Sequence, residues 1–166
     1  GDVPPPKPEM NSRANESVSC DVCHTVSGFD GETPHNFNFV SNPTDGKTKY
    51  GPRGTGNSPE HKIIKSDFLK SADFCGTCHN EMSPFGVWVK STHLEWKEGP
   101  YSKEGVQCQN CHMTQAEGYT AAMGNKYPDA WQHLFHGAHD PGKVKGTIEL
   151  RIHPDIREVE PGETIK

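Results

Sequence analysis

The chain has 166 residues, of which 17 are glycine and 14 are proline, and only 31% are hydrophobic. With a mean hydropathy of −0.83, it has no apolar run near the ~20 residues that cross a bilayer, and an apolar core of its own is hard to build. The net charge of −5 and the lack of a basic cluster argue against nucleic acids and anionic membranes as partners. Some group other than hydrocarbon side chains is therefore expected to fill the interior.

The first third of the chain is predicted to contain little regular structure. Residues 1–15 are polar and rich in proline, which favours an extended arm. A short helix is expected over residues 16–24. Residues 27–57 are rich in Gly, Pro and Asn and are predicted to form a long connection.

Further helices are predicted along the middle of the chain. Ser58 and Pro59 match an N-cap followed by the first helical position. One helix is expected to end at residues 75–79 and another to cover about 105–112. A last helix is expected to open at 127 and to be closed by the glycine at 137.

The last 21 residues have a different pattern. Residues 146–152 alternate in polarity as a strand does, and residues 159–164 match a strand, a turn and a second strand. One hairpin is barely stable alone. We therefore expect either the start of a β-domain that continues further or a strand that pairs with another chain.

All six cysteines lie in three C-x-x-C-H strings, which is the attachment sequence of c-type haem. Two thiols one helical turn apart can each add to a vinyl group on the same edge of a porphyrin, and the next residue then places its imidazole on the iron. The sequence predicts three covalently bound haem c groups. Their attachment residues are Cys20, Cys23, Cys75, Cys78, Cys108 and Cys111, and their proximal iron ligands are His24, His79 and His112.

Other uses of the cysteines fit less well. Structural zinc takes four donors, usually from two C-x-x-C pairs, whereas this chain has three pairs, each with an adjacent histidine. Disulfides are possible in an exported chain, but three identical strings would then be a coincidence. A thioredoxin-like motif needs a βαβ setting that is absent from the pattern.

Three porphyrins would supply the apolar surface that the side chains lack. We therefore expect a mainly α fold with extensive loops, wrapped around stacked haems, with a short β-strand segment at the C-terminus. The expected units are the arm over residues 1–15, a triheme domain over 16–145 and the β segment over 146–166.

Histidine is the predicted ligand on the second face of each iron. Seven histidines remain after the proximal ones, against four methionines, the other usual axial ligand of cytochromes c. His61 falls one turn into a predicted helix, His133 lies among aromatic residues, and His93 follows an apolar patch. The candidates for the three distal positions are His61, His133, His93 and His139, with His35 also open.

Several strings resemble those of exported multihaem c-type cytochromes related to cytochrome c-554. They are Ser58-Pro59-x-His61, Ser71-x-x-Phe74-Cys75-Gly76-x-Cys78-His79, Glu95-Trp96 followed by Gly99-Pro100-Tyr101, Gly105-Val106-Gln107-Cys108-Gln109-x-Cys111-His112-Met113, and His133-x-Phe135-x-Gly137-Ala138-His139-Asp140. The resemblance covers residues 18 to 145 and implies that His61 and His133 are distal ligands. It also implies a β-rich region after the last string. Relatives carry a second histidine before the middle motif, where this chain has Phe68-Leu69, so His93 and His35 are both open as its replacement.

These features predict an electron-transfer protein outside the cytoplasmic membrane, in the periplasm or at the cell surface. Iron with two imidazole ligands has no open position for a substrate, so we expect electrons to pass between redox protein partners. One alternative is an oxidoreductase for nitrite, hydroxylamine or a sulfur compound, which needs a five-coordinate haem. Another is a self-associating haem chain, in a filament or as a subunit of a larger redox assembly.

Overall fold

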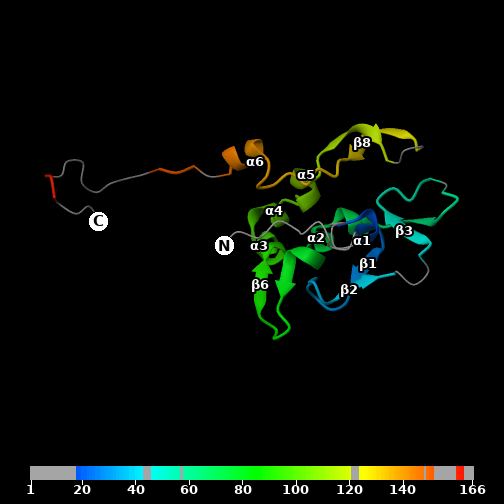
Figure 1. The fold of residues 1–166 in the computed structure, drawn as a ribbon, viewed down its shortest axis with the longest axis horizontal. Helices are drawn as coiled ribbons and strands as arrows, with labels where there is room; N and C mark the ends of the chain where they lie inside the picture. Colours follow the sequence, from blue (N-terminus) through cyan, green and yellow to red (C-terminus); the bar gives the residue numbers. More distant parts are fainter. Residues whose placement is uncertain are drawn as a thin grey trace, which may run out of the picture.

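The protein is described by a computed structural model, which covers residues 18–42, 46–56, 58–120, 124–147, 149–151 and 160–162. Of these residues 29% are helical and 26% lie in strands. The expectation of a mainly α fold is therefore wrong. Figure 1 shows α1, α2 and α5 in the body of the molecule, with ribbons of paired strands extending from it in different directions.

The elements are short and alternate along the chain. In order they are α1 (Cys20–His24), β1 (Val26–Phe29), β2 (Phe39–Ser41), β3 (Thr48–Gly51), β4 (Lys62–Lys65), the 3-10 helix η2 (Asp67–Lys70), α2 (Ala72–His79), β5 (Asn80–Met82), β6 (Trp88–Ser91), α3 (Thr92–Glu98), α4 (Pro100–Lys103), α5 (Cys108–His112), β7 (Gln115–Tyr119), β8 (Lys126–Trp131) and α6 (Pro141–Lys145).

The strands form four separate two-stranded sheets. β1–β2, β5–β6 and β7–β8 are antiparallel, and β3–β4 is parallel, with Tyr50 opposite Ile64. The predicted connection over 27–57 is wrong, because it contains β2, β3 and most of β1. β-branched and aromatic residues favour strands even where glycine and proline separate them by only a few positions.

Two predicted helices are strands or turns instead. Ser58 does not open a helix: its hydroxyl accepts a hydrogen bond from the amide of Glu60 at 3.2 Å, and β4 begins two residues later. A proline at the second position suits such a turn as well as it suits a first helical turn. The segment from 127 begins within β8, and the irregular register opposite Ala116 and Gly118 accommodates its proline.

The helices that carry the C-x-x-C-H strings are confirmed. α2 ends at His79 as expected, and α5 is shorter than the predicted 105–112 but contains the whole third motif. α1 contains the whole first motif. The remainder of the predicted helix 16–24 includes residues 16 and 17, which lie outside the described residues.

The polypeptide has almost no apolar core. Among the described residues, only Val26, Ala72 and Ala130 are buried hydrophobic residues, while many large apolar side chains are exposed. This distribution agrees with the composition and leaves the interior short of apolar side chains. A protein of this size normally buries far more hydrocarbon than three small residues provide.

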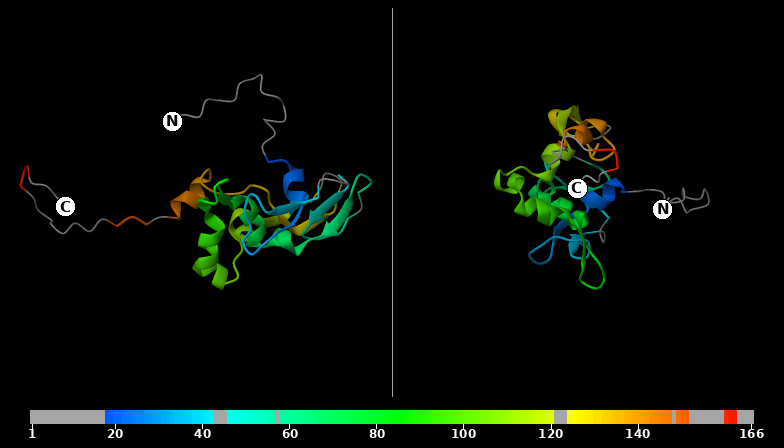
Figure 2. Two further views of the ribbon diagram at one scale, coloured as in Figure 1. Left: turned by 90° about the horizontal axis from the view of Figure 1, so that it is seen from below. Right: turned by 90° about the vertical axis from the view of Figure 1, so that its left-hand side faces the viewer.

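The chain leaves the body of the molecule after α6, which Asp140 caps by accepting hydrogen bonds from the amides of Gly142 and Lys143. Residues 149–151 have no secondary structure and extend away from the other elements (Figures 1 and 2). Of the predicted strands over 146–152 and 159–164, positions 148, 152, 159, 163 and 164 lie outside the described residues, and the described parts are not strands, so the prediction is wrong there. The predicted arm over 1–15 also lies outside the described residues. In the described part of the chain, no helix combines the length and apolarity that a bilayer crossing requires.

Candidate haem-binding site

The three cysteine motifs come together in the fold. α2 packs against α5, and the neighbouring Cys108 side chain, and then burial, raise the pKa of the Cys75 thiol. Burial and then the neighbouring Cys78 raise the pKa of Cys23. Thiols from all three motifs therefore lie in one compact region.

Two glutamines beside Cys108 hold α5 against the start of α2. Gln107 Oε1 accepts a hydrogen bond from the amide of Ala72 at 2.7 Å. Gln109 is buried, and its Nε2 donates to the carbonyls of Leu69 and Ser71 at 3.0 and 2.8 Å. Sequence reasoning missed this role, since the only sign of it is an amide side chain on each side of a helical cysteine.

Two of the motif histidines have the tautomer that a metal ligand needs. His24 Nδ1 lies 2.6 Å from the carbonyl of Tyr50 in β3, and His112 Nδ1 is hydrogen-bonded to the carbonyl of His136. A carbonyl only accepts, so each Nδ1 carries the proton and each Nε2 is left free to bind a metal. The third, His79, is exposed at the end of α2.

His133 faces His24 across a gap of defined size. The two ring centres are 6.2 Å apart, with their planes inclined by 37°. Metal–imidazole bonds are about 2 Å long and a ring centre lies about 1 Å behind its nitrogen, so two imidazoles on opposite sides of one metal have centres about 6 Å apart. His133 is exposed at the surface, but partial desolvation of its ring, and then the proximity of His24, lower its pKa. The pair has the spacing, and His133 the preference for the neutral form, that bis-histidine ligation requires.

A cavity surrounds this pair, and its lining is mainly apolar and aromatic. The lining comes from the first and third motif regions, from α2 just before the second motif, from η2 and the turn after β3, and from the end of β8 and the residues that follow it. It consists of Cys23, His24, Pro52, Leu69, Lys70, Phe74, Gln109, Met113, Trp131, His133 and Phe135. The chemistry of this lining suits the apolar face of a planar ring bonded to Cys23. The cavity measures only about 80 Å³ and Cys20 does not line it, so a haem at the first motif would require the surrounding side chains to move apart.

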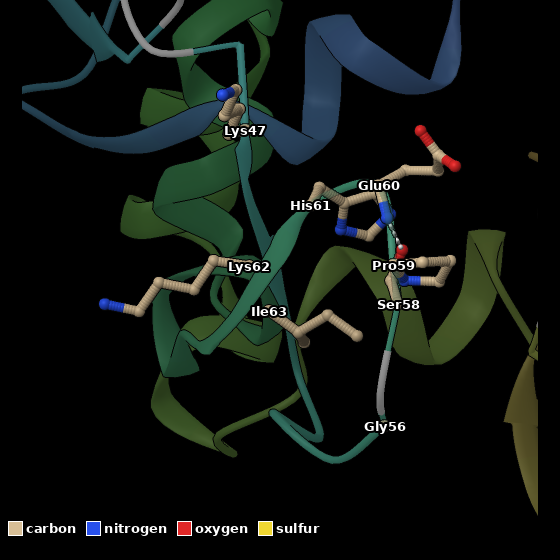
Figure 3. A pocket seen from close by; sticks show the side chains of 8 residues that line it. All are labelled: Lys47, Gly56, Ser58, Pro59, Glu60, His61, Lys62 and Ile63. Carbon is tan, nitrogen blue, oxygen red and sulfur yellow. Dashed lines mark hydrogen bonds between the residues drawn. The ribbon is translucent and has the colours of Figure 1, made fainter.

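His61 lies at the turn before β4, in a pocket whose other lining residues include Lys47 and Lys62 (Figure 3). Its Nδ1 is buried and has no hydrogen-bond partner among the described residues. It is close enough to the first motif to lower the pKa of Asp21, although Lys49 contributes most to that shift. A buried polar nitrogen without a hydrogen-bond partner is uncommon. His61 Nδ1 is therefore available to bind a group that the described residues do not supply.

His93 is held differently from the other candidates. It is 2% exposed, its Nε2 lies 2.9 Å from Asp73 Oδ1, and its Nδ1 lies 3.3 Å from Asn80 Nδ2. Its ring is also 5.4 Å from that of Trp96. Because both ring nitrogens are engaged, we infer a structural role for His93 in packing α3 against α2.

The other histidines have contacts outside this cavity. His35 accepts a hydrogen bond from the amide of Phe37 on Nδ1 at 3.2 Å and meets the ring of Trp88 edge-on. His136 forms an ion pair with Asp140, and His139 is exposed in the turn before α6. The structure thus brings His133, but not these three, against a motif histidine through ring contact.

The burial of His93 predicts a loss of stability in mild acid. Burial lowers its pKa from the usual 6.5, and the opposing effect of Asp73 is smaller. Below about pH 6.5 the unfolded chain therefore binds a proton that the folded chain does not. As the pH decreases, the free energy of unfolding then decreases by up to about 1.4 kcal/mol for each pH unit. Denaturant unfolding of the intact protein at pH 7.5, 6.5 and 5.5 measures this slope. His93→Gln is expected to flatten it, and an identical slope in the variant would contradict the assignment.

No protein-family model, curated protein or solved structure matches this chain. Within the described ranges, no three His, Cys, Asp or Glu side chains are grouped as they would be to hold a metal ion. A haem iron takes only two protein ligands, because the porphyrin supplies four, so a group of three is not required. The candidate site therefore depends on the motif spacing and on the geometry around His24 and His133.

Proposed function

We propose that this chain is a triheme c-type cytochrome that transfers electrons between redox partners. The observation that carries the proposal is the pair of imidazoles, His24 and the exposed His133, whose centres are 6.2 Å apart and which line a mainly apolar cavity beside the first attachment motif. The near absence of buried hydrocarbon elsewhere in the described chain supports it.

The residues that would hold the cofactors are defined by the motifs. Each cysteine pair would bond one haem, and His24, His79 and His112 would be the proximal ligands, with His133 opposite His24. When bound, haem iron supplies a one-electron ferric–ferrous couple. Two imidazoles close both axial positions, and an apolar lining limits access of water to the ring, so the protein would pass electrons without binding a substrate.

The proposed setting is outside the cytoplasmic membrane, in the periplasm or at the cell surface. The convergence of thiols from all three motifs supports short distances between attached groups. The net charge of −5 suits a redox partner with a basic docking patch, and such contacts are usually small and transient.

The decisive experiment combines a haem count with the spin state. Purified native protein is expected to show three haems per chain by pyridine haemochrome assay, with a matching excess in its intact mass. Low-temperature EPR of the oxidised protein is expected to show low-spin iron, and spectroelectrochemistry should show reversible reduction. An intact mass equal to the bare polypeptide would contradict the proposal, and a mass lower by two hydrogen atoms, located at Cys75 and Cys108, would point to a disulfide formed by oxidation instead.

The contacts of His93 favour a second candidate, an oxidoreductase of nitrite, hydroxylamine or a sulfur compound. With both nitrogens of His93 engaged, one fewer histidine is available for the three distal positions. A haem left with one protein ligand could bind a small substrate. This candidate predicts a high-spin ferric signal and a spectral shift with nitrite or hydroxylamine, neither of which a closed electron carrier gives.

A further inference from the structure

We propose that Arg53 is a positioning residue for the first haem, because it ties the strand that orients His24 to the strand that delivers His133. The inference is built on the proposed function and concerns contacts between two parts of the chain that are 76 positions apart.

Arg53 joins the end of β3 to the middle of β8. Its Nη2 donates to Asp129 Oδ1 at 2.6 Å and to the Asp129 carbonyl at 2.7 Å. Its guanidinium carbon lies 4.3 Å from the centre of the Tyr127 ring, within the range of a cation–π contact. The side chain is only 26% exposed, so one arginine makes three contacts with one strand.

These contacts form part of a continuous set of contacts that leads from His24, through β3, Arg53 and β8, to His133. His24 is hydrogen-bonded to Tyr50, which lies three positions before Arg53 in the chain. Asp129 lies four positions before His133, whose ring faces His24 at 6.2 Å. The contact between Arg53 and Asp129 is therefore one of the links that set the distance between the two imidazoles, alongside the backbone hydrogen bonds from Gln132 to Thr114 and from His136 to His112.

Arginine suits this position better than lysine would. Its planar fork can bond two acceptors and lie against an aromatic ring at once, whereas an ammonium group acts as a point charge. An exposed ion pair alone contributes little, but a backbone acceptor and a ring contact add to it. We expect loss of all three contacts to raise the fraction of protein with His133 displaced about tenfold.

The test measures how easily an external ligand displaces His133 in the haem-loaded protein. Cyanide can bind the iron only in molecules in which His133 is displaced. Its apparent Kd therefore varies inversely with the fraction of such molecules. In Arg53→Gln the apparent Kd for one haem is expected to fall about tenfold, with Arg53→Lys intermediate. The matched control is Lys126→Gln, which breaks the ion pair of Lys126 with Glu117 in the same hairpin without touching β3, and which is expected to bind cyanide as the unmodified protein does.

A double variant separates positioning from general destabilisation. If Arg53 acts through His133, Arg53→Gln changes nothing further in a His133→Ala background, whereas a purely structural role adds its effect there too. The inference is overturned if Arg53→Gln binds cyanide like the unmodified protein while His133→Ala binds it tightly. A protein without covalently bound haem would overturn the proposed function, and this inference with it.

Discussion

Replacing His133 with alanine is expected to convert one of the three haems from low-spin to high-spin and to raise its reduction potential. The reason is that His133 faces His24 at the separation of two axial ligands, and no other ring contact to His24 occurs within the described residues. Removing one strong-field imidazole leaves that iron five-coordinate or bound to water. EPR of the oxidised protein measures the change as the loss of one low-spin centre.

Two further variants at this turn sharpen the experiment. Leu134→Ala changes the next residue, which is 56% exposed, and should leave all three centres low-spin. His133→Met retains a side chain that can bind iron, so it should keep the haem low-spin while raising its potential. If His133→Ala retained three low-spin haems, His133 would not be the ligand opposite His24.

Replacing Asn80 with alanine is expected to lower the free energy of unfolding by about 3 kcal/mol. Asn80 is 0% exposed and follows His79 directly. Its Oδ1 accepts hydrogen bonds from the amides of His93 and Leu94 at 3.0 and 3.3 Å, and its Nδ2 donates to the carbonyl of Pro34 at 3.0 Å. Alanine would leave the first turn of α3 and a buried carbonyl without partners. Denaturant unfolding of the haem-loaded protein measures the loss.

Controls for this prediction lie at the same and the next position. Asn80→Asp keeps the acceptor oxygen but replaces the donor by a second acceptor that faces the Pro34 carbonyl and His93 Nδ1. It also buries a carboxylate, so its loss should be at least as large as that of Asn80→Ala. Glu81→Ala breaks an exposed ion pair with Lys90 and should cost less than about 1 kcal/mol. An Asn80→Ala variant as stable as Glu81→Ala would show that the side chain does not cap α3.

The motif helices were predictable because their chemistry is local. The cysteine spacing within each string is fixed by the helical turn, so α1, α2 and α5 occur where the strings are. The pairing of His133 with His24 was not predictable, because it depends on β3 and β8 meeting through Arg53 and Asp129.

The predicted fold class, mainly α, was wrong for a related reason. Strands of three to six residues are too short to display a period, and glycine and proline between them suggest loops. Ser58 and Pro59 were interpreted as the start of a helix, yet four positions after Pro59 the chain is in β4, where Ile63 and Ile64 pair with β3. The roles of Gln107, Gln109 and Asn80 arise from contacts far apart in sequence, which no local pattern reveals.

Among the described residues, the buried hydrocarbon consists of Val26, Ala72 and Ala130, which has a consequence for the biogenesis of the proposed cytochrome. A chain that gains so little from burying its own side chains has no strong tendency to fold as a bare ribosomal product. If haem is attached as proposed, attachment would have to precede folding, and the attachment machinery would act as the effective folding catalyst. Any chain that it missed would be left to proteases.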